Sequence, residues 1–316
     1  MLAFMDKRLV LVMGKGGTGK TTIAAALGLA AARNGKRAVV VEVAEQQRLT
    51  SMFGAEPGDG HGEVELAPRL YGLSIHPGRA MEEWLRHQLR SGTLAGLLGG
   101  SRIFQLLTAA APGVSELVTM GKIWDLAQLE RRTGGSVFDL AIVDAPATGH
   151  GLALLSAPAT FARIARSGPV ARQARLIDQF TRDPGTTAIL AAALPEEMPV
   201  TETIELEDRL AADSLALDAI VVNALYPERF DAEEAASLAL SGTPAGAESD
   251  GHGSPAARAA LAAALSEHRR ATGQRALVER LREEAGARVV TLPHLFSPEL
   301  GRAELERLSE LLEEAL

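Results

Sequence analysis

The fold is decided by the stretch LVLVMGKGGTGKT, which spans residues 9–21. Residues 9–13 form a continuous apolar run, which is typical of a strand that is covered on both faces. Residues 14–21 fit the pattern G-x-x-x-x-G-K-[ST], and the alanine-rich residues 20–33 predict a helix directly after it. A second apolar run at residues 38–43 completes a strand–turn–helix–strand unit, so we expect a parallel sheet.

The glycine-rich turn has the composition of a phosphate-binding loop. Its glycines let the backbone wrap around phosphate oxygens with the N–H groups pointing inward, and the following helix N-terminus adds a positive dipole. We predict that Lys20 reaches the β- and γ-phosphates and that the Thr21 hydroxyl binds Mg²⁺. The glycines also fit the G-x-G-x-x-G pattern of dinucleotide sites, but that pattern leaves Lys20-Thr21 unexplained. The candidate nucleotide-binding residues of the loop are Gly14, Lys15, Gly16, Gly17, Thr18, Gly19, Lys20, Thr21 and Thr22.

Composition excludes several classes of protein. The chain has 316 residues, of which 47% are apolar and 23% charged, as in ordinary folded proteins. Its formal net charge of −8 argues against a nucleic-acid partner, because such partners are bound by neutralising phosphates. The absence of cysteine removes disulfides, thiolate zinc sites and cysteine nucleophiles. The longest uncharged stretch, residues 145–162, contains prolines and glycines, so we expect no membrane insertion and a cytoplasmic location.

Strands and helices alternate along the rest of the chain. We therefore predict one α/β domain over residues 1–316, with the doubly wound, mostly parallel sheet of P-loop NTPases. Helical patterns at 78–132 and 158–187 predict an inserted helical subdomain. Residues 241–255, rich in small residues, predict a disordered loop, and residues 54–68 predict an ordinary loop. Further strands are expected at residues 70–75, 139–143, 219–222 and 288–292, and residues 188–194 fit either a helix or a strand.

A carboxylate follows the apolar strand at residues 139–143. Asp144 stands at the end of that strand, where it can bind Mg²⁺ directly or through water. Pro146 and Gly149 can hinge a loop that senses the γ-phosphate. The sequence therefore predicts a second half of the phosphate site at this strand end.

The spacing of the two lysines in GKGGTGKTT, residues 14–22, resembles the deviant Walker A motif of a group of dimeric ATPases. The group includes the nitrogenase iron protein, the Min and Par ATPases, and the arsenical-pump and tail-anchored-protein-targeting ATPases. In that group the extra lysine crosses the dimer interface to the partner's nucleotide. The resemblance implies that Lys15 stabilises phosphate charge as an arginine finger does, and that the chain dimerises around ATP. The alternative for Lys15 is a solvated loop lysine.

The segment after Asp144 resembles switch II of the arsenical-pump and tail-anchored-protein-targeting ATPases. By the same resemblance, Asn223 at a strand end and Pro293 near the last strand hold the adenine base, although such an asparagine is otherwise often a turn residue. The chain contains no Asn-Lys-x-Asp guanine signature, which favours ATP and ADP over guanine nucleotides. The switch II residues that the resemblance implies are Asp144, Pro146, Thr148, Gly149 and His150.

The chain departs from this family at switch I. The family usually carries an Asp after the second strand that orients the attacking water, whereas this chain has Ala44 near that position. Glu42 or Glu45 can substitute as a catalytic carboxylate, or both are ordinary acidic residues. We therefore expect slow hydrolysis, or hydrolysis that needs a partner.

These features predict Mg²⁺-dependent ATP binding and hydrolysis in a nucleotide-sandwich dimer that opens and closes a helical subdomain. The dimer is a homodimer or a heterodimer with a related ATPase. The alternative is a low-turnover, nucleotide-binding regulatory subunit of such a heterodimer. In the targeting branch the helical subdomain binds a client's membrane helix, so a hydrophobic client helix or a membrane-protein partner is also expected. Core packing is the competing explanation for the apolar side chains of these helices.

Overall fold

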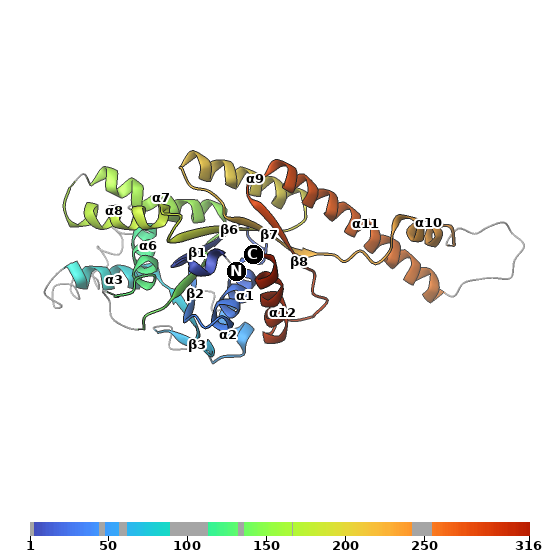
Figure 1. The fold of residues 1–316 in the computed structure, drawn as a ribbon, viewed down its shortest axis with the longest axis horizontal. Helices are drawn as coiled ribbons and strands as arrows, with labels where there is room; N and C mark the ends of the chain where they lie inside the picture. The colour runs from blue at the N-terminus through green and yellow to red at the C-terminus, as the bar shows by residue number, and fades with distance from the viewer. Residues whose placement is uncertain are drawn as a thin grey trace, which may run out of the picture.

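The computed structural model describes residues 3–43, 48–56, 62–88, 113–131, 136–165, 167–241 and 255–316. Within these residues the chain forms an eight-stranded sheet in the order β3-β4-β2-β5-β1-β6-β7-β8 (Figure 1). All neighbouring strands are parallel except β3 and β4, so the predicted doubly wound α/β fold is confirmed. The strands are β1 (Leu9–Met13), β2 (Ala38–Val43), β3 (Val64–Ala67), β4 (Leu70–Ile75), β5 (Leu140–Asp144), β6 (Thr187–Ala193), β7 (Ala219–Leu225) and β8 (Arg288–Pro293).

The prediction of a loop over residues 54–68 is wrong for residues 64–67, which form β3. This edge strand is the antiparallel partner of β4, with Val64 opposite Gly72. Leu66 and Ala67 are buried against the sheet, which supplies the stability that the local sequence lacks. The segment at residues 188–194, for which the sequence left two choices, is the fully buried strand β6.

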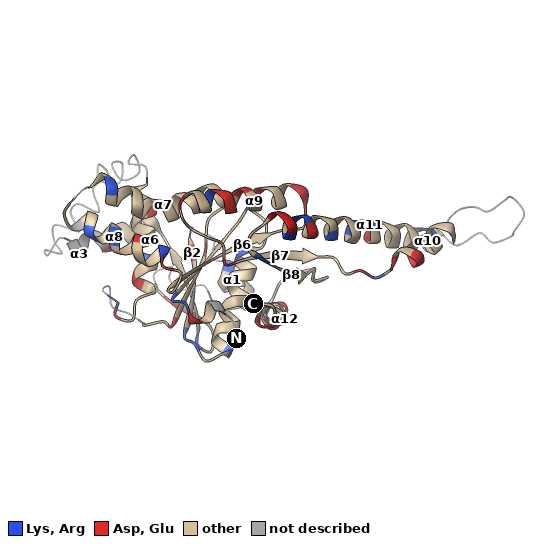
Figure 2. Cartoon of the chain, turned by 45° about the horizontal axis from the view of Figure 1, so that its top comes forward, with Lys and Arg blue, Asp and Glu red and all other residues tan. Residues whose placement is uncertain are grey.

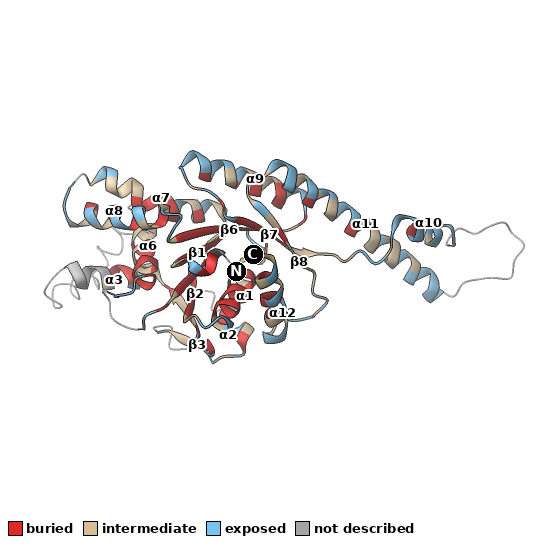
Figure 3. Ribbon diagram, in the orientation of Figure 1, coloured by how far each residue is buried: buried red, intermediate tan, exposed pale blue. Residues whose placement is uncertain are grey.

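The core lies on both faces of the sheet (Figure 3). Along β1, Leu9, Leu11 and Met13 pack on one face, whereas Val10 and Val12 pack on the other. The second face is covered by α1 (Lys20–Arg33), α2 (Arg48–Phe53) and α12 (Arg302–Ala315). The first face is covered by α3 (Pro77–Gln88), α6 (Val114–Leu126), α7 (Thr148–Ile164), α8 (Pro169–Arg182), α9 (Glu197–Ala212) and the inner part of α11 (Pro255–Glu284).

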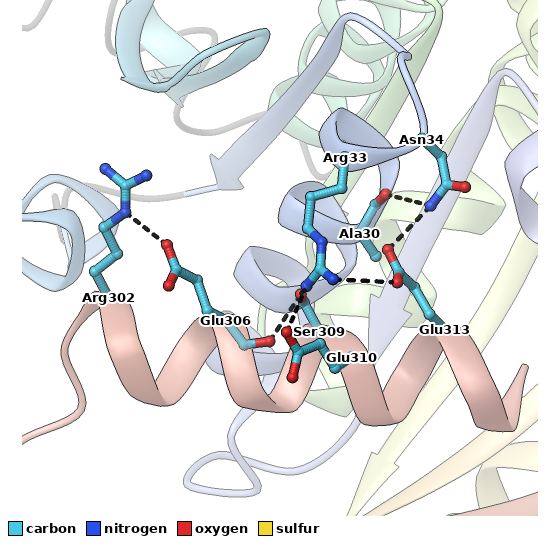
Figure 4. Close-up of polar contacts among 8 residues, drawn as sticks. All are labelled: Ala30, Arg33, Asn34, Arg302, Glu306, Ser309, Glu310 and Glu313. Atoms are coloured by element: carbon cyan, nitrogen blue, oxygen red, sulfur yellow. Dashed lines mark hydrogen bonds and ion pairs between the residues drawn. The ribbon is translucent and has the colours of Figure 1, made fainter.

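Polar contacts fasten the C-terminal helix α12 to the end of α1 (Figure 4). Arg33 donates to the hydroxyl of Ser309 at 3.1 Å and pairs with Glu310 at 3.3 Å. Asn34 donates to the carboxylate of Glu313 at 3.0 Å. Since α1 begins at the glycine-rich turn, α12 braces the helix that carries Lys20 and Thr21.

Two groups of helices lie at opposite ends of the sheet (Figure 1). Helices α3, α6, α7 and α8 pack against one another at one end. At the other end, α10 (Ala232–Ser241) and the outer part of α11 extend away from the sheet. The predicted loop at residues 241–255 lies outside the described residues, apart from its two ends. None of the helices in the described ranges has the length and apolar character needed to span a membrane.

Candidate nucleotide-binding site

The glycine-rich turn lies at the carboxyl end of the central strand β1, between the ends of β5 and β6. Gly14 has φ +139°, and a Cβ there would lie 2.3 Å from the carbonyl oxygen of Ala192 in β6. Gly19 has φ +88°, and a Cβ there would lie 2.1 Å from Nδ2 of Asn223 in β7. Position 14 therefore requires glycine because a side chain collides with the backbone of β6, and position 19 because its left-handed backbone strains any other residue.

We expect Gly14→Ala to destabilise the fold by about 1–3 kcal/mol, because a left-handed backbone would carry a Cβ against a fixed carbonyl. Gly16→Ala is the matched control, since φ at Gly16 is ordinary and a Cβ there meets nothing within 4 Å. The free energy of unfolding in urea would measure both variants. Equal stability of the two variants would contradict this account of the loop.

Lys20 points back over the loop, where Nζ donates to the carbonyl oxygen of Lys15 at 2.9 Å. Burial lowers the pKa of Lys20, an effect that Asp144 opposes and Arg48 reinforces. A poorly solvated ammonium gains from an incoming anion, because phosphate oxygens replace the water that it has lost. The residue is thus suited to bind a phosphate group at this loop.

Thr21, in the first turn of α1, lies in contact with Asp144 at the end of β5, as expected of two residues that share a cation. The Thr21 hydroxyl donates to Oδ2 of Asp144 at 2.5 Å. Burial raises the pKa of Asp144, whereas the Thr21 hydrogen bond, Lys20 and Arg48 each lower it. A hydroxyl and a carboxylate at the mouth of a phosphate loop are the hard oxygen donors that Mg²⁺ prefers, so this pair fits that ion.

Glu42 is the only described candidate for the catalytic carboxylate, because Ala44 and Glu45 lie outside the described residues. It stands opposite Asp144 in the β2–β5 register and is 5% exposed. Its Oε1 accepts the backbone N–H groups of Arg48 at 2.9 Å and Leu49 at 3.3 Å. Burial raises the pKa of Glu42, and the charge of Asp144 raises it further. The carboxylate therefore holds the start of α2 beside the site.

Sequence reasoning missed Arg48, the first residue of α2. Its guanidinium interacts electrostatically with Lys20, Glu42 and Asp144. A basic residue a few positions after the missing switch I aspartate was the available signal. It adds a further positive charge, on an exposed side chain, to the phosphate end of the site.

The segment predicted as switch II connects Asp144 directly to a helix. Ala145 hydrogen-bonds through its N–H to Val12 of β1, and Pro146 follows. Helix α7 then begins at Thr148, so Thr148, Gly149 and His150 form its first turn. Because α7 packs against α6 and α8, a shift at Asp144 has a short path to these helices.

The two predicted adenine residues lie on the neighbouring strands β7 and β8. The strand end predicted at Asn223 is wrong, because β7 continues to Leu225. Asn223 donates through Nδ2 to the carbonyl oxygen of Thr18 in the loop at 3.2 Å. Pro293 ends β8 and lines a pocket of about 640 Å³ beside the loop between β8 and α12. His294 and Phe296 line this pocket, and their rings pack with that of Tyr226 in tilted and edge-to-face contacts, with centroids 4.5–5.6 Å apart. Sequence reasoning did not single out these three rings.

Lys15 points away from Lys20 and toward α9. Its Nζ pairs with Oε1 of Glu202 at 2.6 Å and contacts the sulfur of Met198. About one third of the Lys15 side chain is exposed. The lysine is thus at the rim of the site and not inside it.

Comparisons with known proteins agree with this geometry. A family model described as "Anion-transporting ATPase" matches residues 7–167. The "ATPase BagA" of Mycobacterium tuberculosis is 31% identical over 237 residues, which cover 73% of this chain and 69% of that protein. The "ATPase GET3" of Kluyveromyces lactis is 24% identical over 71% of this chain and 74% of its own length. The "ATPase GET3B" of Arabidopsis thaliana is 26% identical over 72% of this chain and 66% of its own length.

Proposed function

The chain belongs to the anion-transporting ATPase family, and on that premise we propose that it hydrolyses ATP in a cytoplasmic dimer with the nucleotide at the interface. The observation that carries this proposal is the junction of Lys20, Thr21 and Asp144 at the ends of β1 and β5. These residues place the ammonium of Lys20 and the hard oxygen ligands of Thr21 and Asp144 beside the glycine-rich loop. ATP and ADP are the proposed nucleotides.

In this proposal the phosphates lie in the loop of residues 14–19, with Lys20 on the β- and γ-phosphates. Thr21 and Asp144 would hold Mg²⁺, which neutralises phosphate charge when bound. Asn223 already contacts the loop, and Pro293 lines the adjoining pocket, so the adenine base is proposed to lie on that side. The rings of His294 and Phe296, which line that pocket, can pack against the flat face of a base.

Lys15 is proposed to act on the nucleotide of the partner subunit. We expect Lys15→Ala to lower the turnover of ATP by about ten- to a hundredfold, because one charge-assisted hydrogen bond to phosphate is lost. Steady-state ATPase assays and mass measurements in ADP and in a non-hydrolysable ATP analogue would test this. Turnover that falls together with a nucleotide-dependent homodimer supports the proposal.

A second candidate function is a regulatory subunit that binds ATP with little turnover. Ala44 at the switch I position favours it, as does the engagement of Glu42 with the backbone of α2. A related chain would then supply the water-positioning carboxylate in a heterodimer. Tight ATP binding without turnover, and without a nucleotide-dependent homodimer, would favour this second function over the first.

We also propose that nucleotide state moves the packed helices α3, α6, α7 and α8 through the switch II segment. The segment from Asp144 to the start of α7 is short, and α7 packs against α6 and α8. Ile164 of α7 is 68% exposed and Leu176 of α8 is 38% exposed. These apolar groups support binding of a hydrophobic client helix or a membrane-protein partner.

A further inference from the structure

The lysine that we propose to act on a partner's nucleotide is held by its own subunit. Lys15 Nζ lies 2.6 Å from Oε1 of Glu202, which is a close ion pair. The side chains of Lys15 and Glu202 are 34% and 35% exposed, so the pair lies on the surface at the rim of the site. Met198 flanks the pair and is 63% exposed.

The carboxylate is the fixed member of this pair. Met198 and Glu202 are four residues apart on α9 and share one side of the helix. The neighbouring face of the helix buries Val200, Leu206 and Leu210 in the core, which sets the rotation of α9 about its axis. Its first turn also pairs with α11 through Glu197 and Arg280 at 2.6 Å. Figure 2 shows α9 as a helix rich in acidic residues beside α11.

The lysine is the member that can move. Its carbonyl oxygen accepts hydrogen bonds from Lys20 Nζ at 2.9 Å and from the Thr18 hydroxyl at 3.0 Å, so its backbone is held inside the loop. Only its flexible side chain extends outward to α9. In the proposed dimer, Nζ would exchange Glu202 for a phosphate of the other subunit, since the flexible lysine side chain is the member of the ion pair that can move.

We propose that Glu202 is a positioning residue, which retains Lys15 in the unpaired subunit and releases it when two subunits close around the nucleotide. This inference rests on the proposed function of Lys15. Each time the dimer closes, Lys15 exchanges its contact with the Glu202 carboxylate for a contact with phosphate. The Lys15–Glu202 ion pair therefore opposes dimerisation. Exposed ion pairs have small net stability, and the expected effect of removing this one is about two- to fivefold.

The first test measures the lysine without any nucleotide. Lys15 would be acylated with an amine-reactive ester, and its rate of modification followed by peptide mass spectrometry. We expect a rate about two- to fivefold faster in Glu202→Gln than in the wild type. Glu205→Gln is the matched control, because Glu205 lies on the same helix but pairs with Arg209. Equal rates in all three proteins would overturn the proposal, whatever the ATPase activity proves to be.

The second test measures dimerisation in the presence of a non-hydrolysable ATP analogue, from the molecular mass in solution as a function of protein concentration. Glu202→Gln is expected to dimerise at about two- to fivefold lower protein concentration than the wild type. Glu202→Asp keeps the carboxylate, so it should dimerise at nearly the wild-type concentration. In a Lys15→Ala background Glu202→Gln should have no effect, because it acts through the lysine. Weaker pairing in both backgrounds would mean that Glu202 contacts the partner directly, and the inference would be wrong. A wild type that never pairs would refute the proposed dimer, whereas the acylation rates would still test the retention of Lys15.

Discussion

Lys20→Ala is expected to lower kcat for ATP hydrolysis by about 10²–10³-fold, because in the proposed site it removes the ammonium that would face the charge developing on the transferred phosphoryl group. Partial burial strips the Lys20 ammonium of some of its hydration and thereby lowers its pKa. Because less water surrounds this ammonium, little solvent reorganisation is needed when phosphate binds to it. Steady-state hydrolysis and ATP affinity, measured separately, would divide the loss between chemistry and binding.

Lys36→Ala is the matched control for this variant. Lys36 lies beyond the far end of α1, so the same charge is removed at a distance from the site. Its turnover is expected to match the wild type. Turnover of Lys20→Ala within threefold of the wild type would show that this loop is not the hydrolytic site. Thermal unfolding of both variants would confirm that each one is folded.

The phosphate half of the site could be predicted because it depends on local sequence. The strand Leu9–Met13, the glycine turn and the start of α1 are continuous in the chain, and each has a pattern of its own. Asp144 could be placed because a carboxylate at the end of a buried strand meets the ends of its parallel neighbours. The Thr21–Asp144 contact joins two such local predictions across 123 residues of sequence.

The contacts of Lys15 could not be predicted, because they depend on how α9 is rotated. The partner of Lys15 is 187 residues away, and acidic residues are common along α9. Core packing of Val200 and Leu206, and not the pattern of charges, selects Glu202 among them. The same limit explains β3, whose burial depends on pairing with β4.

The catalytic carboxylate stays a prediction. Glu42 lies near Asp144, but its oxygen accepts two N–H groups of α2, and these contacts were not visible in the sequence. They follow from the position of α2, which packs Leu49 and Phe53 on the sheet. Glu45 lies outside the described residues, so the choice between the two carboxylates rests on experiment.

Asp144→Asn is expected to lower Mg²⁺-dependent turnover by about 10²–10³-fold while stabilising the ligand-free protein at neutral pH. Burial raises the pKa of Asp144, so the folded state binds this proton more readily than the unfolded state does. The ligand-free wild type therefore loses stability as pH rises from the ordinary aspartate pKa to the raised one. Asparagine removes the buried charge, so the melting temperature should be higher and depend less on pH across that window.

Glu42→Gln separates the two effects of that substitution. Burial also raises the pKa of Glu42, so the same pH-dependent gain in stability is expected when its charge is removed. The hydrogen bonds of Glu42 go to the backbone of α2, whereas Asp144 accepts the Thr21 hydroxyl at 2.5 Å. The stabilisation of the protein by ATP should therefore still depend on Mg²⁺ in Glu42→Gln and lose that dependence in Asp144→Asn. Melting temperatures with ATP, with and without a chelator, would decide, and equal Mg²⁺ dependence in both variants would remove Asp144 from the cation site.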